Sequence, residues 1–220
     1  MFFVNFKTYK EATGDNAVRL AIACEHIYET TKIQVVPVVQ ATDAWRIKQY
    51  VHMPIWIQHV DEYGYGQHNG AVTAEAAIQA EVSGILLNHS EHPLQFDTLK
   101  RTVDHINSLN IMISYMICAP DTNVLAQAKE LSPTYIAYEP PELIASTVDS
   151  VATKNSNVIT AGVEIADDIP LIVGAGIKAK EDVVASLRRG AKGILVSSAI
   201  VTSDKPEEKL HELASAFKSD

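Results

Sequence analysis

Residues 170–198 read PLIVGAGIKAKEDVVASLRRGAKGILVSS, and this stretch decides the fold class. It begins with a short apolar run that ends in GAG, continues with helix-forming composition from Ala179 to Arg189, and closes with a second apolar run, GILVSS. Neither run alternates apolar with polar residues, which is typical of strands buried on both faces of a parallel sheet. A strand, a helix and another strand in this order predict a right-handed crossover.

The same alternation runs through the whole chain. Six earlier apolar runs have the same character: FFVNF, IQVVPVV, IWIQHV, GILLN, IMISYMI and YIAY. Further helical segments are predicted at Asp15–Glu29, Thr73–Ala80, Phe96–Asn107, Asp121–Leu131, Val158–Ala166 and Pro206–Phe217. Eight such units in 220 residues predict an α/β fold of the (β/α)8 barrel type, folded as a single domain over residues 1–220. A doubly wound open sheet is the alternative architecture.

Composition narrows the possible partners and the compartment. The net charge of -9 disfavours nucleic acid and anionic membrane surfaces as main partners. No apolar run approaches the ~20 residues that a membrane span needs. The two cysteines, Cys24 and Cys118, lie in unrelated contexts and suggest reduced thiols and a cytoplasmic location. Cys118 belongs to a predicted strand, where a small buried side chain is the expectation.

Polar side chains gather at the carboxyl ends of the predicted strands, where barrels of this type carry their active sites. They belong to Asn5, Lys7, Gln58, His59, Asn88, His89, Ser90, Glu91, Glu139, Ser197 and Ser198. The segment Gly174, Ala175 and Gly176 lies at the same end of the predicted strands. Among them, Lys7 supplies a positive charge, His89 can share a proton near neutral pH, and Glu139 is a candidate base.

A candidate phosphate site follows the last two strands. Gly174 and Gly176 allow close backbone approach, and we expect the helix after them to present free N–H groups to an anion. Ser197 and Ser198 lie one strand further along, where this fold often binds phosphate. A base, an imidazole, a cation and a phosphate clamp suit proton transfer next to a carbonyl on a phosphorylated substrate.

Five motifs extend the comparison from single residues to a family. They are NFKTYKEATG at 5–14, NHSE at 88–91, AYEPPELI at 137–144, GAGI at 174–177 and LVSSAI at 195–200. In their order and spacing the chain resembles the triosephosphate isomerase family, in the short form typical of archaea. The resemblance implies interconversion of dihydroxyacetone phosphate and D-glyceraldehyde 3-phosphate in glycolysis and gluconeogenesis, with no metal and no organic cofactor.

The resemblance also implies a role for each matching residue. Glu139 would move the proton between two carbons, and neutral His89 would polarise the carbonyl. Lys7 would hold the substrate and stabilise the enediolate, with Asn5 beside it and Glu91 orienting it. The phosphate would rest on backbone N–H groups of three segments: Ile144, Ala145 and Ser146; Gly174, Ala175 and Gly176; and Ser197 and Ser198.

One segment departs from the family pattern. The lid tip of the family usually reads Ile-Gly-Thr-Gly, whereas residues 144–147 here read Ile-Ala-Ser-Thr. Alanine and threonine adopt positive φ only with strain, so a weaker phosphate clamp is expected. Losing one oriented backbone donor in such a site costs on the order of 3 kcal/mol, or roughly a hundredfold in rate. The departure leaves open a degenerate member that binds a phosphorylated ligand with weak or no turnover.

Different chemistry on the same barrel also stays open. Another phosphate-binding barrel enzyme, such as an aldolase or a phosphoribosyl isomerase, would share the glycine and serine signals. An aldolase needs a Schiff-base lysine inside a strand, and the predicted strands offer only Lys7 near an end. His92 lies three residues beyond His89 and could form a metal pair with it, although no third ligand has a defined spacing.

The glycine-rich segment DEYGYGQHNGAVTAE, residues 61–75, bears on assembly. In the resembled family this loop inserts into a neighbouring subunit, and Thr73 matches the threonine that crosses to the partner's active site. The resemblance therefore implies a homodimer or, as in short archaeal relatives, a homotetramer. A surface loop without a partner is the simpler interpretation.

Overall fold

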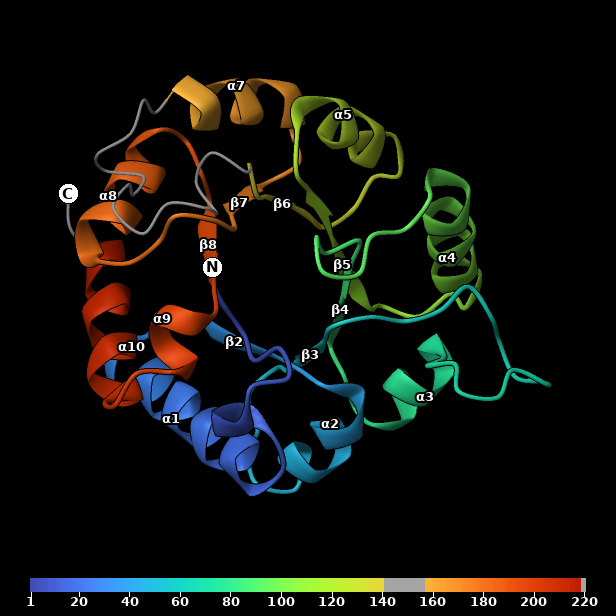
Figure 1. The fold of residues 1–220 in the computed structure, drawn as a ribbon, viewed down its shortest axis with the longest axis horizontal. Coiled ribbons are helices and arrows are strands. Elements are labelled where there is room, and N and C mark those ends of the chain that lie inside the picture. The colour runs from blue at the N-terminus through green and yellow to red at the C-terminus, as the bar shows by residue number, and fades with distance from the viewer. Residues whose placement is uncertain (141–156, 219–220) are drawn as a thin grey trace.

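The computed structural model describes residues 1–140 and 157–218 of the chain (Figure 1). Eight parallel strands close into a barrel in sequence order, because the first strand pairs with both the second and the eighth. The strands are β1 (Phe2–Asn5), β2 (Val35–Val39), β3 (Trp56–Ile57), β4 (Gly84–Leu87), β5 (Ser114–Ala119), β6 (Tyr135–Tyr138), β7 (Leu171–Val173) and β8 (Gly193–Val196). The predicted barrel is confirmed, and closure of the sheet excludes the open architecture.

Figure 1 shows the helices as a ring around the outside of the barrel. They are α1 (Asp15–Thr31), α2 (Ala41–Lys48), α3 (Ala74–Gln79), α4 (Phe96–Ser108), α5 (Thr122–Glu130), α7 (Asn157–Ala166), α8 (Lys180–Arg188), α9 (Ser198–Val201) and α10 (Pro206–Ser215), with short 3-10 helices η1 (Lys10–Ala12) and η2 (Ala216–Lys218). The predicted helices are confirmed, with ends shifted by at most two residues. Within the described residues, no helix is long and apolar enough to cross a membrane.

Aromatic rings fill the interior of the barrel. The Phe3 ring meets the ring of Trp56 edge-on, with centroids 5.0 Å apart, and that of Tyr135 at 5.5 Å. The indole fits because Gly84, on the neighbouring strand, has no side chain: a Cβ there would lie 2.0 Å from Trp56 Cε2. The remaining interior side chains are Val36, Val38, Leu86, Met116, Cys118, Ala137, Ile172 and Leu195.

The fifth strand begins later than the sequence predicts. The run IMISYMI indicated a strand from Ile111 onward, but β5 starts at Ser114. Ile111 and Met112 lie outside the sheet with exposed fractions of 50% and 102%. The first residue of β4, Gly84, pairs with Ser114, so earlier residues have no partner in the neighbouring strand. Apolar composition alone did not reveal where that partner begins.

Gly84→Ala should lower the free energy of unfolding by about 1–3 kcal/mol, because the added methyl group overlaps the Trp56 ring in a close-packed interior. Urea unfolding monitored by circular dichroism measures this. The same change in a Trp56→Leu background should cost less, since the ring is then absent. An equal cost in both backgrounds would contradict the packing argument.

Candidate active site

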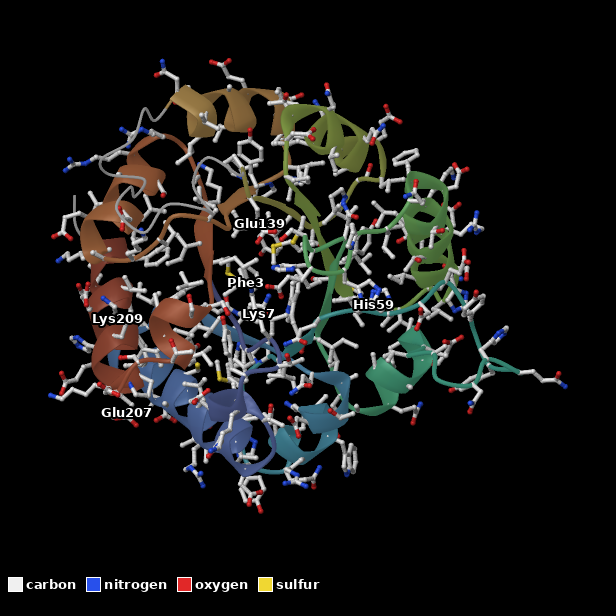
Figure 2. The ribbon with its side chains drawn as sticks, viewed as in Figure 1. Phe3, Lys7, His59, Glu139, Glu207 and Lys209 are labelled. Carbon is white, nitrogen blue, oxygen red and sulfur yellow. The ribbon has the colours of Figure 1, made fainter. Side chains whose placement is uncertain are left out.

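The polar strand-end residues converge at the carboxyl end of the barrel, because all eight parallel strands end on the same side. Figure 2 shows Lys7 and Glu139 inside the ring of helices, whereas Glu207 and Lys209 lie on the outer helix α10. A cavity of about 350 Å³ opens beside Lys7. Its lining comprises Asn5, Lys7, Thr8, Gln58, His59, Leu86, His89, Glu91 and His92.

Lys7 presents its ammonium group at the cavity from an unusual backbone conformation. It follows β1 and has φ +47, in the left-handed region. Its N–H donates to Asn5 Oδ1 at 3.0 Å, and its carbonyl oxygen accepts from Gln58 Nε2 at 3.0 Å. Its Nζ lies 2.7 Å from Glu91 Oε1, the partner that the family resemblance implies. The side chain is thus held at both its backbone and its charged end.

His89 follows β4 and faces the Glu139 carboxyl group. Its Nδ1 accepts the backbone N–H of Glu91 at 3.1 Å, so in the neutral ring the proton lies on Nε2. That Nε2 lies 3.5 Å from Glu139 Oε1. Burial, and secondarily the charge of Lys7, lower the pKa of His89, while Glu91 opposes them. The imidazole is therefore neutral at neutral pH and directs an N–H at the carboxyl group.

Glu139 comes directly after β6 and is 4% exposed. Burial raises its pKa to about 7, against the lowering effects of the Lys7 charge and a hydrogen bond from the Cys118 thiol; Glu91 adds a smaller upward effect. The carboxyl group packs against Gly174, where a Cβ would lie only 2.5 Å from Glu139 Cγ. A carboxyl group with this pKa can take up and release a proton near neutrality.

The expected phosphate segments have different surroundings. The N–H of Gly174 donates to Tyr138 O at 2.9 Å, so this glycine provides room for Glu139 and its N–H is already engaged. Ala175 and Gly176 follow, and Gly176 has φ +73. Ser197 follows β8 as the N-cap of α9, and Ser198 is the first residue of that helix. Among the described residues, Ser197 Oγ is buried without a hydrogen-bond partner. Ile144, Ala145 and Ser146 lie outside the described residues.

The expectation of free N–H groups at the start of α8 is wrong. Asp182 Oδ2 accepts the backbone N–H groups of Lys178 and Ala179, both at 2.9 Å. The N–H of Lys180 donates to Glu212 Oε1 at 3.2 Å. Two carboxylates thus occupy the donors that an anion would use. An acidic residue in the first turn is a common helix-capping device, and here it removes this helix from the anion site.

Three residues near the base and the cavity received no functional role from the sequence. Gln58 bonds the backbone of Lys7, and Cys118 bonds Glu139 from inside the barrel. His59, expected to be an ordinary loop residue, stacks on His92 with ring centroids 4.2 Å apart, and its Nε2 lies 3.3 Å from Asp61 Oδ1. The strand-end position of Gln58 and His59 was the available signal.

A metal site at His89 and His92 finds no support in the part of the chain that the structure describes. There, no group of three or more histidine, cysteine, aspartate or glutamate side chains is arranged to hold a metal ion. His92 stacks on His59. Nδ1 of His89 accepts a backbone N–H.

The loop of residues 61–72 projects outward beyond α3 and α4 (Figure 1). Its ends are tied together, because Asp61 N–H donates to Val72 O at 2.8 Å and Val72 N–H donates to Asp61 Oδ2 at 2.7 Å. Tyr65 near its tip is 76% exposed. Thr73 follows as the N-cap of α3, its Oγ1 accepting the N–H of Ala76 at 3.2 Å.

Comparison with known proteins connects this geometry to a family. The family model for triosephosphate isomerase matches residues 1–216. This chain belongs to the triosephosphate isomerase family. Membership makes it an enzyme of the isomerase class and agrees with the resemblance carried by the sequence motifs.

Curated relatives of this family match over nearly their whole length. The chain is similar to triosephosphate isomerase from Methanothermus fervidus, with 34% identity over 96% of this chain and 95% of the relative. It is also similar to that from Thermoplasma volcanium, with 36% identity over 96% and 97%. A crystal structure of triosephosphate isomerase from Bartonella henselae shares the fold, with a TM-score of 0.77, 16% identity, and coverage of 99% of this chain and 98% of that one.

The raised pKa of Glu139 predicts a pH-dependent stability difference. The folded pKa of about 7 lies above the unfolded value of 4.5, so the folded protein loses stability as pH rises from about 4.5 to about 7, where Glu139 is ionised only in the unfolded chain. Glu139→Gln removes this ionisable group. The variant should therefore be more stable than the wild type at pH 8 by about 3 kcal/mol, and the difference should vanish below about pH 4.5.

Urea unfolding of both proteins at pH 8 and at pH 4.5 tests this. Glu130→Gln, at the end of α5, is the matched control and should show no such pH-dependent difference in stability from the wild type. A variant less stable than the wild type at pH 8 would contradict the burial argument.

Proposed function

We propose that this protein interconverts dihydroxyacetone phosphate and D-glyceraldehyde 3-phosphate through an enediolate. The observation that supports this most directly is the pairing of a buried carboxyl group of pKa about 7 with a neutral imidazole that directs an N–H at it. A base and a neutral proton donor at one point suit removal of a proton next to a carbonyl. Membership of the triosephosphate isomerase family suggests the substrate.

Each residue then has a chemical role in the proposal. The Glu139 carboxylate removes a proton from the carbon beside the carbonyl and later returns it to the neighbouring carbon. Nε2–H of His89 donates to the carbonyl oxygen, where negative charge develops. The Lys7 ammonium, held by Glu91 and flanked by Asn5, stabilises that charge electrostatically.

The phosphate group is assigned to the other side of the mouth. We infer that it rests on backbone N–H groups at Ala175 and Gly176 and at Ser197 and Ser198, together with the segment of Ile144, Ala145 and Ser146. The engaged N–H of Gly174 and the capped start of α8 leave these as the candidates in this region. Dry surroundings strengthen such electrostatic contacts, so closure over the phosphate would favour the reaction.

We infer that the reaction serves glycolysis and gluconeogenesis in the cytoplasm and that residues 1–220 form one domain. The buried free thiols of Cys24 and Cys118 are consistent with a reducing compartment. Pairing of β1 with β8 brings the two ends of the chain into one barrel, which supports a single folding unit.

A coupled assay of glyceraldehyde 3-phosphate isomerisation on the wild type, Glu139→Gln and Glu130→Gln tests the proposed reaction. Glu139→Gln should lose roughly 10²–10⁴-fold in kcat, because the amide cannot accept the proton, while Glu130→Gln should match the wild type. An inactive wild type whose Tm still rises with a phosphorylated enediolate analogue would indicate a degenerate member that only binds its ligand.

We further propose that the protein acts as a homodimer or a homotetramer, in which the loop of residues 61–72 enters the neighbouring subunit beside Thr73. The projection of this loop and the exposure of Tyr65 support the proposal, since a long exposed aromatic loop is a common interaction surface. The cavity beside Lys7, about 350 Å³, is the proposed receiving site.

Thr73→Arg should shift the protein to monomers and lower kcat/KM about tenfold or more, because a bulky cation cannot enter a site that already holds Lys7. Analytical ultracentrifugation and the coupled assay measure both effects. Thr73→Ser keeps the helix cap and should leave mass and activity unchanged. A monomeric wild type with full activity would refute the dimer proposal.

A further inference from the structure

Lys7 has a positive φ, and it lies in a different part of the fold from most other described non-glycine residues with positive φ. Seven non-glycine residues there have positive φ. Five of them, Lys32, Glu81, Asn110, Ser132 and Asp167, lie one or two residues beyond the end of a helix, where the left-handed conformation is ordinary. The other two, Lys7 and Asn88, follow strands at the active site. Asparagine tolerates this region well, but lysine does not.

Side-chain amides hold both peptide groups that flank Lys7. On one side, the Lys7 N–H donates to Oδ1 of Asn5, which is 3% exposed. On the other side, Gln58 reaches across from the end of β3, and its Nε2 donates to Lys7 O at 3.0 Å and to Val38 O at 3.3 Å. A left-handed residue persists only where its surroundings over-determine it, and these bonds fix the peptide orientation before and after Lys7.

The conformation of Lys7 decides where its ammonium lies. Nζ stands 2.7 Å from Glu91 at the cavity, and its charge lowers the pKa of both Glu139 and His89. In the described part of the chain, the titratable groups that face Glu139 are Lys7 after β1, His89 and Glu91 after β4, and Cys118 from β5. Burial lowers the pKa of His89 and raises that of Cys118 well above its usual value. Lys7 lowers the pKa of Glu139 and Glu91 raises it, so the position of the Lys7 ammonium affects the ionisation of Glu139.

We propose that Gln58 is a positioning residue of the isomerase site, which clamps Lys7 in the left-handed conformation and so sets the position of the ammonium relative to Glu139. Gln58 acts through Lys7 and need not touch the substrate. The inference rests on the proposed function, in which the Lys7 ammonium stabilises the developing negative charge. By this proposal, the Gln58 amide after β3 controls the electrostatic interaction between Lys7 after β1 and Glu139 after β6.

Gln58→Met keeps the length of the side chain and removes the donor. We expect kcat/KM to fall about 10- to 100-fold, because a misplaced ammonium no longer meets the transition state. The acid limb of the kcat/KM–pH profile should also move to higher pH. Lys7 lowers the pKa of Glu139, so moving its charge away raises that pKa and the base ionises later.

Gln40→Met is the matched control. Gln40 lies at the end of β2, and its Nε2 donates to Thr13 Oγ1 at 2.9 Å. This variant should leave both kcat/KM and the pH profile unchanged. Wild-type kcat/KM in Gln58→Met would overturn the proposal, and so would a fall in kcat/KM without a pH shift, because a purely structural loss does not move the profile.

A stability cycle tests the clamp without any activity. Glycine accepts positive φ at no steric cost, so Lys7→Gly should melt about 2–4 °C higher than Lys7→Ala. In the Gln58→Met background this difference should shrink, because the released backbone can leave the left-handed region. Equal Tm values of the two variants in the wild-type background would overturn the proposal even if Gln58→Met does not fold.

The proposed isomerase function and the proposed clamp of Gln58 on Lys7 can be refuted separately. A wild type without isomerase activity would refute the proposed function, whereas the Tm comparison at Lys7 would still report on the clamp. An active wild type with no difference between Lys7→Gly and Lys7→Ala would refute the clamp alone.

Discussion

The pairing of β1 with β8, in which Phe2, Phe3 and Val4 lie beside Ile194, Leu195 and Val196, turns an open sheet into a closed barrel. Closure satisfies the backbone groups that two sheet edges would otherwise leave unpaired. It also requires close approach of the first residue of the chain to the last strand: a Cβ at Gly193 would lie 2.1 Å from Met1 O. Because of this closure, residues from the two ends of the chain meet at one mouth.

The closed interior also explains the chemistry of that mouth. The barrel is filled by packed aromatic and aliphatic side chains, so a carboxyl group at the carboxyl end of β6 loses its hydration. Desolvation raises the pKa of Glu139 toward neutrality and lowers that of His89, so a carboxyl group that exchanges a proton near neutral pH lies beside an imidazole that stays neutral. The Lys7 charge limits the first shift and adds to the second. Among the described residues, burial and the charge of Lys7 therefore act together on the ionisation of Glu139 and His89.

In the expected phosphate region, carboxylate side chains accept backbone N–H groups that an anion would also use. A glycine-rich turn before a helix often marks an anion site because the helix start offers free N–H groups. In this chain Asp182 and Glu212 already accept those N–H groups at α8. Gly174 serves the base by leaving room for its side chain. In the proposed site, the backbone at Ala175, Gly176, Ser197 and Ser198 remains as a candidate for holding the phosphate.

Sequence alone determined the barrel, the order of its elements and the set of strand-end polar residues, because burial on both faces and helical composition are local properties of the chain. It also predicted Asn5, Lys7, His89, Glu91 and Glu139 as site residues, since the motifs that carry them are specific to one family. Sequence could not determine the true start of β5, because that depends on where β4 offers a partner. It could not reveal the clamp of Gln58 on Lys7 or the bond of Cys118 to Glu139, because these contacts join residues of different strands and depend on how the strands are placed in the barrel. Nor could it foresee the capped start of α8, where the donors are taken by side chains rather than left for a ligand. Only the tertiary structure decides which of several possible acceptors bonds a given donor, since the closed barrel sets the distances between them.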